Sequence, residues 1–177
     1  TVEKKMSFYE THFYQKFILW MGSFNEGVDF INNKFDDDAI FINSKFQDLA
    51  FINGRFLGEI RFDACLFVNS FAIKNTLITK EINFQNAQLG KHVVFDGIES
   101  ESIFRFEETV LPDTLELMNL DLALSLDFDK ANFTKNNHCL LYLENVDISD
   151  FWLDFRFFKL WFPSRCKLDN AARIELF

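Results

Sequence analysis

Residues 29–35 read DFINNKF, residues 40–46 read IFINSKF and residues 50–56 read AFINGRF. In each stretch, two aromatic residues five positions apart enclose a short polar segment. Beyond these stretches, apolar residues recur at alternating steps of five and six residues, and only the step from Phe46 to Phe51 departs, by one residue. A fixed period is the signature of a repeat architecture, so this eleven-residue unit by itself predicts a fold built from repeats.

The apolar series spans most of the chain, and 16 of the 25 phenylalanines fall on it. Ser100 and Glu144 are its two polar members. The series runs through Phe8, Phe13, Leu19, Phe24, Phe30, Phe35, Phe41, Phe46, Phe51, Phe56, Phe62, Phe67, Ile73, Ile78, Phe84, Leu89, Phe95, Ser100, Phe106, Leu111, Leu117, Leu122, Phe128, Phe133, Cys139 and Glu144.

The residues two places before each series member alternate in size. After a six-residue step they are mostly large and apolar, and after a five-residue step they are mostly small. The large set includes Phe17, Val28, Ile60, Phe71, Ile82, Val93, Phe104, Leu115 and Leu126. The small set includes Thr11, Gly22, Asn33, Ser44, Gly54, Cys65, Thr76, Ala87, Thr109 and Ala131.

An eleven-residue period is also compatible with a helix of about 3.67 residues per turn. At about 100° per residue, however, the four apolar positions of the unit would lie on opposite faces rather than in one stripe. In an extended chain the same positions form two i, i+2 pairs, and residues i and i+2 point the same way. The sequence therefore predicts short strands joined by polar corners and wound into a solenoid. A leucine-rich repeat is the nearest rival solenoid, but its closely spaced leucines and recurrent asparagine are not here.

The unit resembles the pentapeptide-repeat family, in particular a Phe-rich variant in which one extra residue separates two five-residue units. Residues 29–35, 40–46 and 50–56 carry the resemblance, together with two more standard units at residues 146–150 and 151–155. The resemblance implies an all-β fold, a right-handed quadrilateral parallel β-helix in which each unit forms one face. Four units per coil give about 6.5 coils and a rod about 31 Å long at about 4.8 Å per coil.

On the fold that this resemblance implies, residues one coil apart stack in columns. One column runs through Leu19, Phe41, Phe62, Phe84, Phe106 and Phe128, and its link from Phe41 to Phe62 is shorter because of the short step before Phe51. Ser100 is expected in a corner loop that bulges from the rod. Glu144 is expected to mark a slip of the register.

The chain divides into a β-helix over residues 1–155 and an aromatic C-terminal segment over residues 156–177, expected to form a short helical cap with a helix that begins at Ser164. Residues 151–162 contain seven aromatic residues in twelve. Three interpretations stay open: an intramolecular cap, a homodimer interface of the tail-to-tail kind known in the family, or a longer protein that continues past Phe177. The predicted cap or dimerisation residues are Trp152, Phe155, Phe158, Trp161 and Phe162.

Length and composition exclude several classes. With 177 residues, 49% of them hydrophobic, the chain suits one compact domain. The longest stretch without a charge, Ala64 to Ile73, is far shorter than the ~20 apolar residues that a membrane-spanning helix needs. No secretory signal is visible, so a cytoplasmic location is expected. Cys65, Cys139 and Cys166 are too few for a disulfide framework and lack metal-binding spacing.

The net charge of −9 is uneven. Residues 1–95 sum to −1, residues 96–150 to −10 and residues 151–177 to +2. We call residues 96–150 the acid block. It argues against direct binding to nucleic acid or to an anionic membrane.

No catalytic motif is present, and neither catalytic residues, nor a metal site, nor a cofactor is predicted. The run Asp36-Asp37-Asp38 is interpreted as a solvated turn rather than a cation site. His12, His92 and His138 are interpreted as surface imidazoles.

The leading functional hypothesis is a non-catalytic protein-binding or scaffold module that presents an acidic face, with Glu99, Glu101, Glu107 and Glu108 as the predicted partner-binding residues. The resemblance supplies one alternative, because some pentapeptide-repeat proteins are acidic rods that mimic duplex DNA and bind gyrase. A glycan-cleaving β-helix is the remaining alternative, since Glu99/Glu101 and Glu107/Glu108 are carboxylate pairs. The identity of a protein partner does not follow from the sequence.

Overall fold

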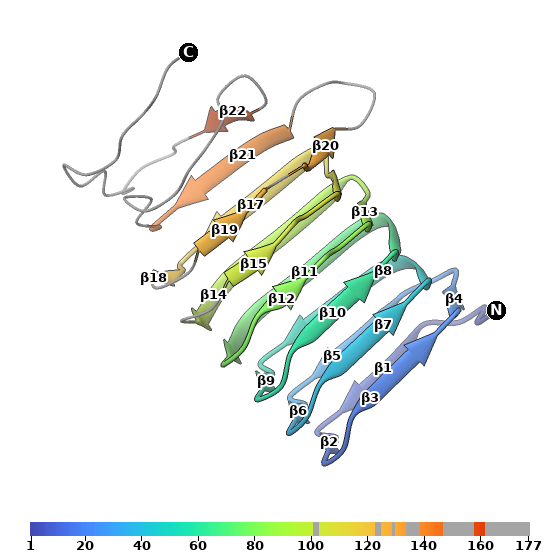
Figure 1. Ribbon diagram of the computed structural model, residues 1–177. Coiled ribbons are helices and arrows are strands. Elements are labelled where there is room, and N and C mark those ends of the chain that lie inside the picture. The colour runs from blue at the N-terminus through green and yellow to red at the C-terminus, as the bar shows by residue number, and fades with distance from the viewer. Residues whose placement is uncertain (101–102, 123–124, 129, 134–138, 147–157, 162–177) are drawn as a thin grey trace.

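The computed structural model describes residues 1–100, 103–122, 125–128, 130–133, 139–146 and 158–161. Those residues form strands and turns and no helix, and the strand pairs are parallel. The chain winds as a β-solenoid of about six turns, with the N-terminal strands at one end of the stack and β21 toward the other (Figure 1). The prediction of an all-β parallel solenoid is confirmed.

The strands belong to two sheets. The larger sheet contains β1 (Met6–Tyr9), β2 (His12–Phe13), β4 (Ser23–Phe24), β5 (Val28–Ile31), β6 (Lys34–Phe35), β8 (Lys45–Ile52), β9 (Arg55–Phe56), β11 (Leu66–Ile78), β13 (Gln88–Leu89), β14 (His92–Ser100), β16 (Val110–Leu111), β17 (Thr114–Met118), β18 (Asp121–Leu122), β20 (Asn132–Phe133), β21 (Cys139–Glu144) and β22 (Phe158–Trp161). The smaller sheet contains β3 (Phe17–Trp20), β7 (Ala39–Ile42), β10 (Ile60–Asp63), β12 (Ile82–Asn83), β15 (Ile103–Arg105) and β19 (Ser125–Asp127).

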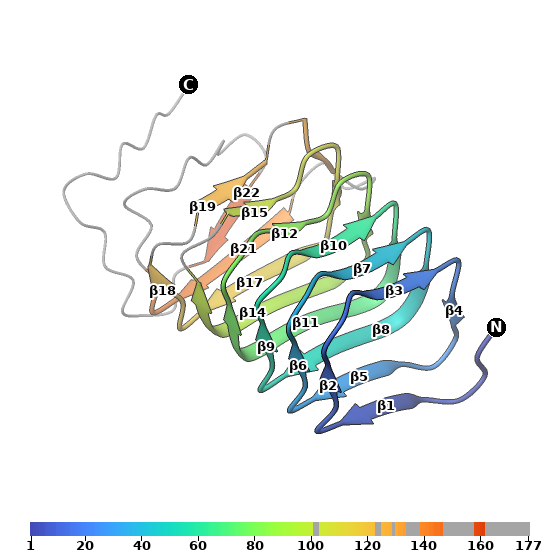
Figure 2. The ribbon, with the colours of Figure 1, turned by 60° about the horizontal axis from the view of Figure 1, so that its bottom comes forward.

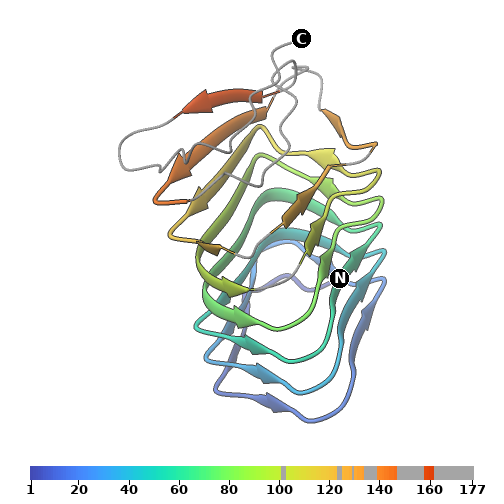
Figure 3. The ribbon, with the colours of Figure 1, turned by 60° about the vertical axis from the view of Figure 1, so that its left-hand side comes forward.

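One coil contains four strand segments, as β1, β2, β3 and β4 show for the first turn. β5 then lies over β1, with Met6 paired to Val28 and Phe8 to Phe30. Figures 2 and 3 show the successive coils stacked above one another, with the smaller sheet on one side of the rod.

The coil from Phe30 to Phe51 is one residue shorter than the coil on either side of it. Phe30 pairs with Phe51, whereas Phe51 pairs with Ile73, one position further along the chain than an equal step would reach. Only two residues separate Phe46 from Leu49 at this corner. Three residues separate Phe67 from Phe71 at the same corner of the next coil. The predicted shorter link is confirmed, and it keeps every inward side chain on the inside.

The corners depend on residues with positive φ. Among the described residues, twelve non-glycine residues have φ between 48° and 56°, and asparagine, which tolerates the left-handed region best, supplies seven of them. Eleven of them come after the end of a strand, and Asn75 lies within β11. The twelve are Glu10, Met21, Asn32, Asn43, Asn53, Ala64, Asn75, Asn86, Glu108, Asn119, Lys130 and Asn145.

At several of these corners, the residue after the positive-φ position has a small buried polar side chain that joins neighbouring coils. Thr76 Oγ1 accepts a hydrogen bond from the Gly54 backbone N–H at 3.2 Å and donates to the Lys74 carbonyl at 2.8 Å. Ser44 Oγ accepts a hydrogen bond in the same way from the backbone N–H of Gly22 in the preceding coil. Buried polar side chains are therefore tolerated here because each satisfies a backbone group.

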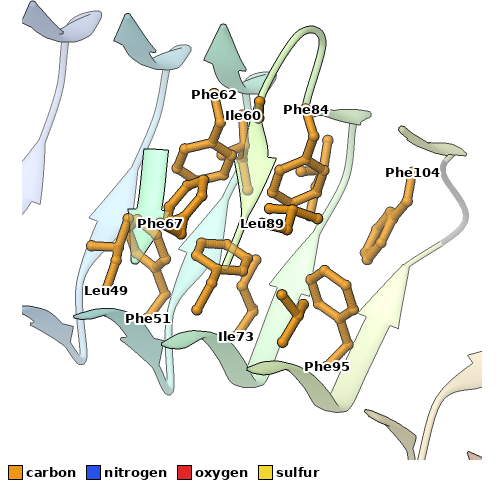
Figure 4. Packing of buried hydrophobic residues seen from close by; sticks show 14 of the residues in the cluster. Leu49, Phe51, Ile60, Phe62, Phe67, Ile73, Phe84, Leu89, Phe95 and Phe104 are labelled. Atoms are coloured by element: carbon orange, nitrogen blue, oxygen red, sulfur yellow. The ribbon is translucent and has the colours of Figure 1, made fainter. Parts of the chain in front are cut away.

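Stacked apolar side chains fill the interior (Figure 4). In the predicted column, Phe62 stacks on Phe41 at 5.0 Å and on Phe84 at 5.2 Å between ring centroids. Phe106 continues the stack at 5.1 Å from Phe84, and Phe128 follows at 4.9 Å. The column is confirmed.

Two local predictions are wrong. Ser100 is not in a bulging loop, because it is buried at the end of β14 and pairs with Ile78. The register slip precedes Glu144, because Leu117 pairs with Leu143 instead of with Cys139. Phe133 and Leu141, the partners of Leu111 and Leu115, are four residues further apart in the sequence than Leu111 and Leu115 are, and this accounts for the difference.

The end of the described chain is a strand. β22 pairs in parallel with β21, so strand pairing continues past residue 155. The predicted helix from Ser164 lies outside the described residues.

Candidate protein-binding surface

The predicted acidic residues lie at two separate places on a coil. Glu99 is exposed on β14 in the larger sheet, between Leu77 and Asp121 of the neighbouring coils. Glu107 and Glu108 follow β15 of the smaller sheet, and Glu108 occupies a corner with φ of 54°. Glu101 lies outside the described residues. The sequence therefore identified exposed acids, but the coil separates them into two groups.

Two carboxylates of the acid block contact basic side chains on neighbouring coils. Glu107 Oε1 lies 3.3 Å from Lys130 Nζ, and Glu116 Oε1 lies 2.8 Å from His92 Nε2. Because these contacts join adjacent coils, these carboxylates help to hold the rod together. In contrast, neither Glu99 nor Glu108 forms a hydrogen bond or ion pair with the part of the chain that the structure describes.

Arg105 holds two more carboxylates across three coils. Its Nε donates to Glu81 Oε2 at 3.0 Å, and its Nη1 lies 3.5 Å from Asp127 Oδ2. The hydrogen bond to Glu81 is the main reason that the pKa of Arg105 is raised, with Asp127 adding to it. These contacts partly neutralise the negative charge on this side of the rod.

Outward positions in the larger sheet form a ladder along which the sign of the charge changes. We call it the charge ladder. Its members are His12, Lys34, Arg55, Leu77, Glu99 and Asp121, each paired in register with the next. Sequence reasoning missed the ladder, although reading the sequence in steps of one coil would have found it.

Two aspartates of the run at residues 36–38 contact basic side chains. Asp36 contacts Lys34 at 2.7 Å and His12 at 2.8 Å, and Asp38 contacts Lys16 at 2.9 Å. The pKa of Asp36 is lowered mainly by its hydrogen bond to Lys34 and further by its hydrogen bond to His12. The pKa of Asp38 is lowered mainly by its hydrogen bond to Lys16. No cluster of three or more potential metal ligands occurs among the described residues.

The cysteines of the described chain lie inside the rod. Burial raises the pKa of Cys65 and of Cys139 to about 12, so both thiols stay protonated and unreactive at neutral pH. Cys166 and His138 lie outside the described residues.

The predicted C-terminal aromatic residues are only partly placed. Phe158 and Trp161 begin and end β22. Trp152, Phe155 and Phe162 lie outside the described residues.

The described residues include no helix long and apolar enough to cross a membrane. Comparisons with protein-family models, with curated proteins and with solved structures found no match to this chain.

Proposed function

We propose that this protein is a non-catalytic protein-binding or scaffold module whose rigid rod presents acidic side chains to a partner. The observation that carries the proposal is the contrast within the acid block. Glu107 contacts Lys130 and Glu116 contacts His92 on neighbouring coils, whereas exposed Glu99 and Glu108 bind nothing in the described chain. Exposed, unpaired carboxylates at fixed positions suit recognition by basic side chains, because they give up no internal contact on binding.

We further propose that the solenoid is a right-handed quadrilateral β-helix of the pentapeptide-repeat kind. Support comes from the four strand segments in each coil and from the alternating spacing of inward side chains. The right hand follows from the handedness that parallel crossover connections prefer.

The other two hypotheses have less support. A mimic of duplex DNA needs a continuous array of negative charge, but the charge ladder begins with His12, Lys34 and Arg55. A glycosidase needs a carboxylic acid and a carboxylate facing each other. Glu107 is instead bound to Lys130, so it is a poor candidate for either role.

The proposal can be tested with two matched double variants. Glu99→Gln/Glu108→Gln removes the unpaired acids, while Glu10→Gln/Glu26→Gln removes two exposed acids from the first coils. Each pair contains one positive-φ corner residue, Glu108 or Glu10, and each double variant removes two negative charges.

Immobilised wild-type protein and both variants should be compared in affinity capture from native lysate at low and high salt. We expect wild type and the Glu10/Glu26 variant to capture the same protein in a salt-sensitive way, and the Glu99/Glu108 variant to lose it. Equal capture by all three proteins would contradict the acidic-surface proposal.

A further inference from the structure

The centre of the charge ladder carries opposite charges on the two sides of an apolar residue. Its four central members belong to successive coils, and each is paired in register with the next: Lys34, Arg55, Leu77 and Glu99. Figure 2 shows β6 and β9, which supply the first two, as neighbours in the stack. Because the strands are parallel, successive members lie about 4.8 Å apart along the rod. Arg55 and Glu99 are therefore at equal distances from Leu77.

Arg55 and Glu99 have no ionic partner within the described chain. Both residues are exposed, and neither forms a hydrogen bond or an ion pair with the residues that the structure describes. Leu77, between them, is partly exposed. Lys34 differs, because its Nζ lies 2.7 Å from Asp36 Oδ1. The unpaired charges at the centre of the ladder are therefore one cation and one anion.

The order of these two charges selects the partner. A surface of uniform negative charge would attract Arg55 but repel Glu99, and a surface of uniform positive charge would do the reverse. Both side chains are paired only by a surface that carries the two charges at the same spacing and in the reverse order along the rod. A second copy of this chain, turned end for end, presents that order at that spacing. A parallel copy would place Arg55 opposite Arg55, and facing like charges cost free energy.

The charge of the whole rod favours the same orientation. Residues 1–95 sum to −1, whereas the acid block of residues 96–150 sums to −10. Two parallel copies side by side would place one acid block against the other. When one copy is turned end for end about the level of Leu77, each acid block lies beside the nearly neutral coils of the other copy, so the repulsion is smaller.

We propose that the charge ladder is a docking surface for the charge ladder of a second copy, in an antiparallel dimer whose two-fold axis lies at the level of Leu77. Such an interface is isologous, so Arg55 of each copy faces Glu99 of the other and the pair occurs twice. The two Leu77 side chains meet at the axis. The inference rests on the proposed function in one respect, because it names the partner that Glu99 recognises.

Sedimentation equilibrium of the whole chain tests the inference. The concentration range should extend to about 200 µM, so that a weak dimer is detected. At an ionic strength of about 20 mM, where screening is weak, we expect wild type to approach twice its monomer mass of 20.9 kDa. At about 0.5 M salt the dissociation constant should rise at least about tenfold, because exposed ion pairs are screened.

Charge reversal gives the sharpest readout. Arg55→Glu and Glu99→Arg should each be monomeric alone, because each change makes like charges face one another. An equimolar mixture of the two variants should form a heterodimer, since every charge of one ladder then faces an opposite charge of the other. The matched controls Lys45→Glu and Glu108→Arg reverse exposed charges that lie off the ladder and should dimerise like wild type. All four residues are exposed, so the circular dichroism spectrum should stay unchanged.

A wild type that is monomeric at low salt would overturn the inference. So would a mixture of Arg55→Glu and Glu99→Arg that stays monomeric, or either variant dimerising alone as wild type does. The proposed function is judged separately by affinity capture from lysate. If wild type is monomeric but a different captured protein is lost in Glu99→Gln/Glu108→Gln, this inference fails and the proposed function stands.

Discussion

The early and late coils use the same inward positions for different side chains. In residues 6–67 three columns begin with stacked phenylalanines, such as Phe13 on Phe35 at 4.5 Å between centroids. In the later coils aliphatic residues replace most of these rings, for example Ile78 after Phe56. Both regions nevertheless keep the parallel register. Aromatic stacking therefore strengthens the coil but does not define it, and the positive-φ corners, which both regions share, define its path.

The largest effect on the free energy of unfolding should come from alanine substitutions of buried core residues in the two regions. Phe62→Ala removes a fully buried ring that contacts rings on both neighbouring coils, and should lower the free energy of unfolding by about 3–5 kcal/mol. Leu117→Ala, equally buried in the aliphatic region, should cost less, within about 2–5 kcal/mol. Urea denaturation measures both values. A larger loss for Leu117→Ala would show that the stacked region is not the more strongly packed one.

Two buried threonines of the later coils should differ in their contribution to stability for a specific reason. Thr76→Val leaves the Gly54 N–H buried without an acceptor and should cost about 1–3 kcal/mol. Thr109→Val should cost less, because the Phe84 carbonyl that its hydroxyl contacts also accepts from the Ala87 N–H. The same denaturation experiment compares them. Equal losses would mean that bulk, rather than the satisfied N–H, is what the position requires.

Corner substitutions should have opposite signs. Gly97 has a φ of 62°, and a Cβ there would lie 2.6 Å from Asn75 Oδ1, so Gly97→Ala should destabilise by about 1–2 kcal/mol. Ala64 has a φ of 53°, so Ala64→Gly should stabilise by a few tenths to about 1 kcal/mol. Thermal unfolding of the two variants checks the signs. Destabilisation by Ala64→Gly would contradict the role given to positive-φ corners.

The smallest effect should come from the surface ion pairs of the early coils. The pKa values of Asp36 and Asp38 are lowered in the folded state, so their contribution to stability is present above about pH 4, near the unfolded pKa, and is lost as the pH falls through the folded values. Asp36→Asn/Asp38→Asn should therefore be slightly less stable than wild type at pH 6 and equal to it at strongly acidic pH. Denaturation midpoints at the two pH values measure the difference, and a constant difference would exclude these carboxylates as its cause.

The sequence predicted the fold because its core periodicity is local and strict. The stack through Phe62 and Phe84, and even the shortened coil before Phe51, follow from counting residues. Ser100 was misplaced because polarity suggested a loop, although the small side chain fits the buried row. The position of the register slip before Leu143 was not predicted, because the residues that precede it carry no apolar pattern from which a register can be read.

The surface was less predictable, because partners there lie one coil apart. Glu107 looks like any exposed acid until Lys130 of the next coil is placed beside it. Trp20 and Ile18 likewise carry no signal of exposure in a chain with so many aromatic residues. Only the structure shows that both are exposed side chains of β3.

The register of the coils is the central claim, and a pair of cysteine variants tests it most directly. Ala50 and Ala72 are outward neighbours in register, so Ala50→Cys/Ala72→Cys should form a disulfide on mild oxidation, identified by peptide mass. In Ala50→Cys/Lys74→Cys the second cysteine is displaced by two positions along the strand, and no such disulfide should form. Cross-linking of the second pair, or failure of the first, would contradict the parallel register of the coils.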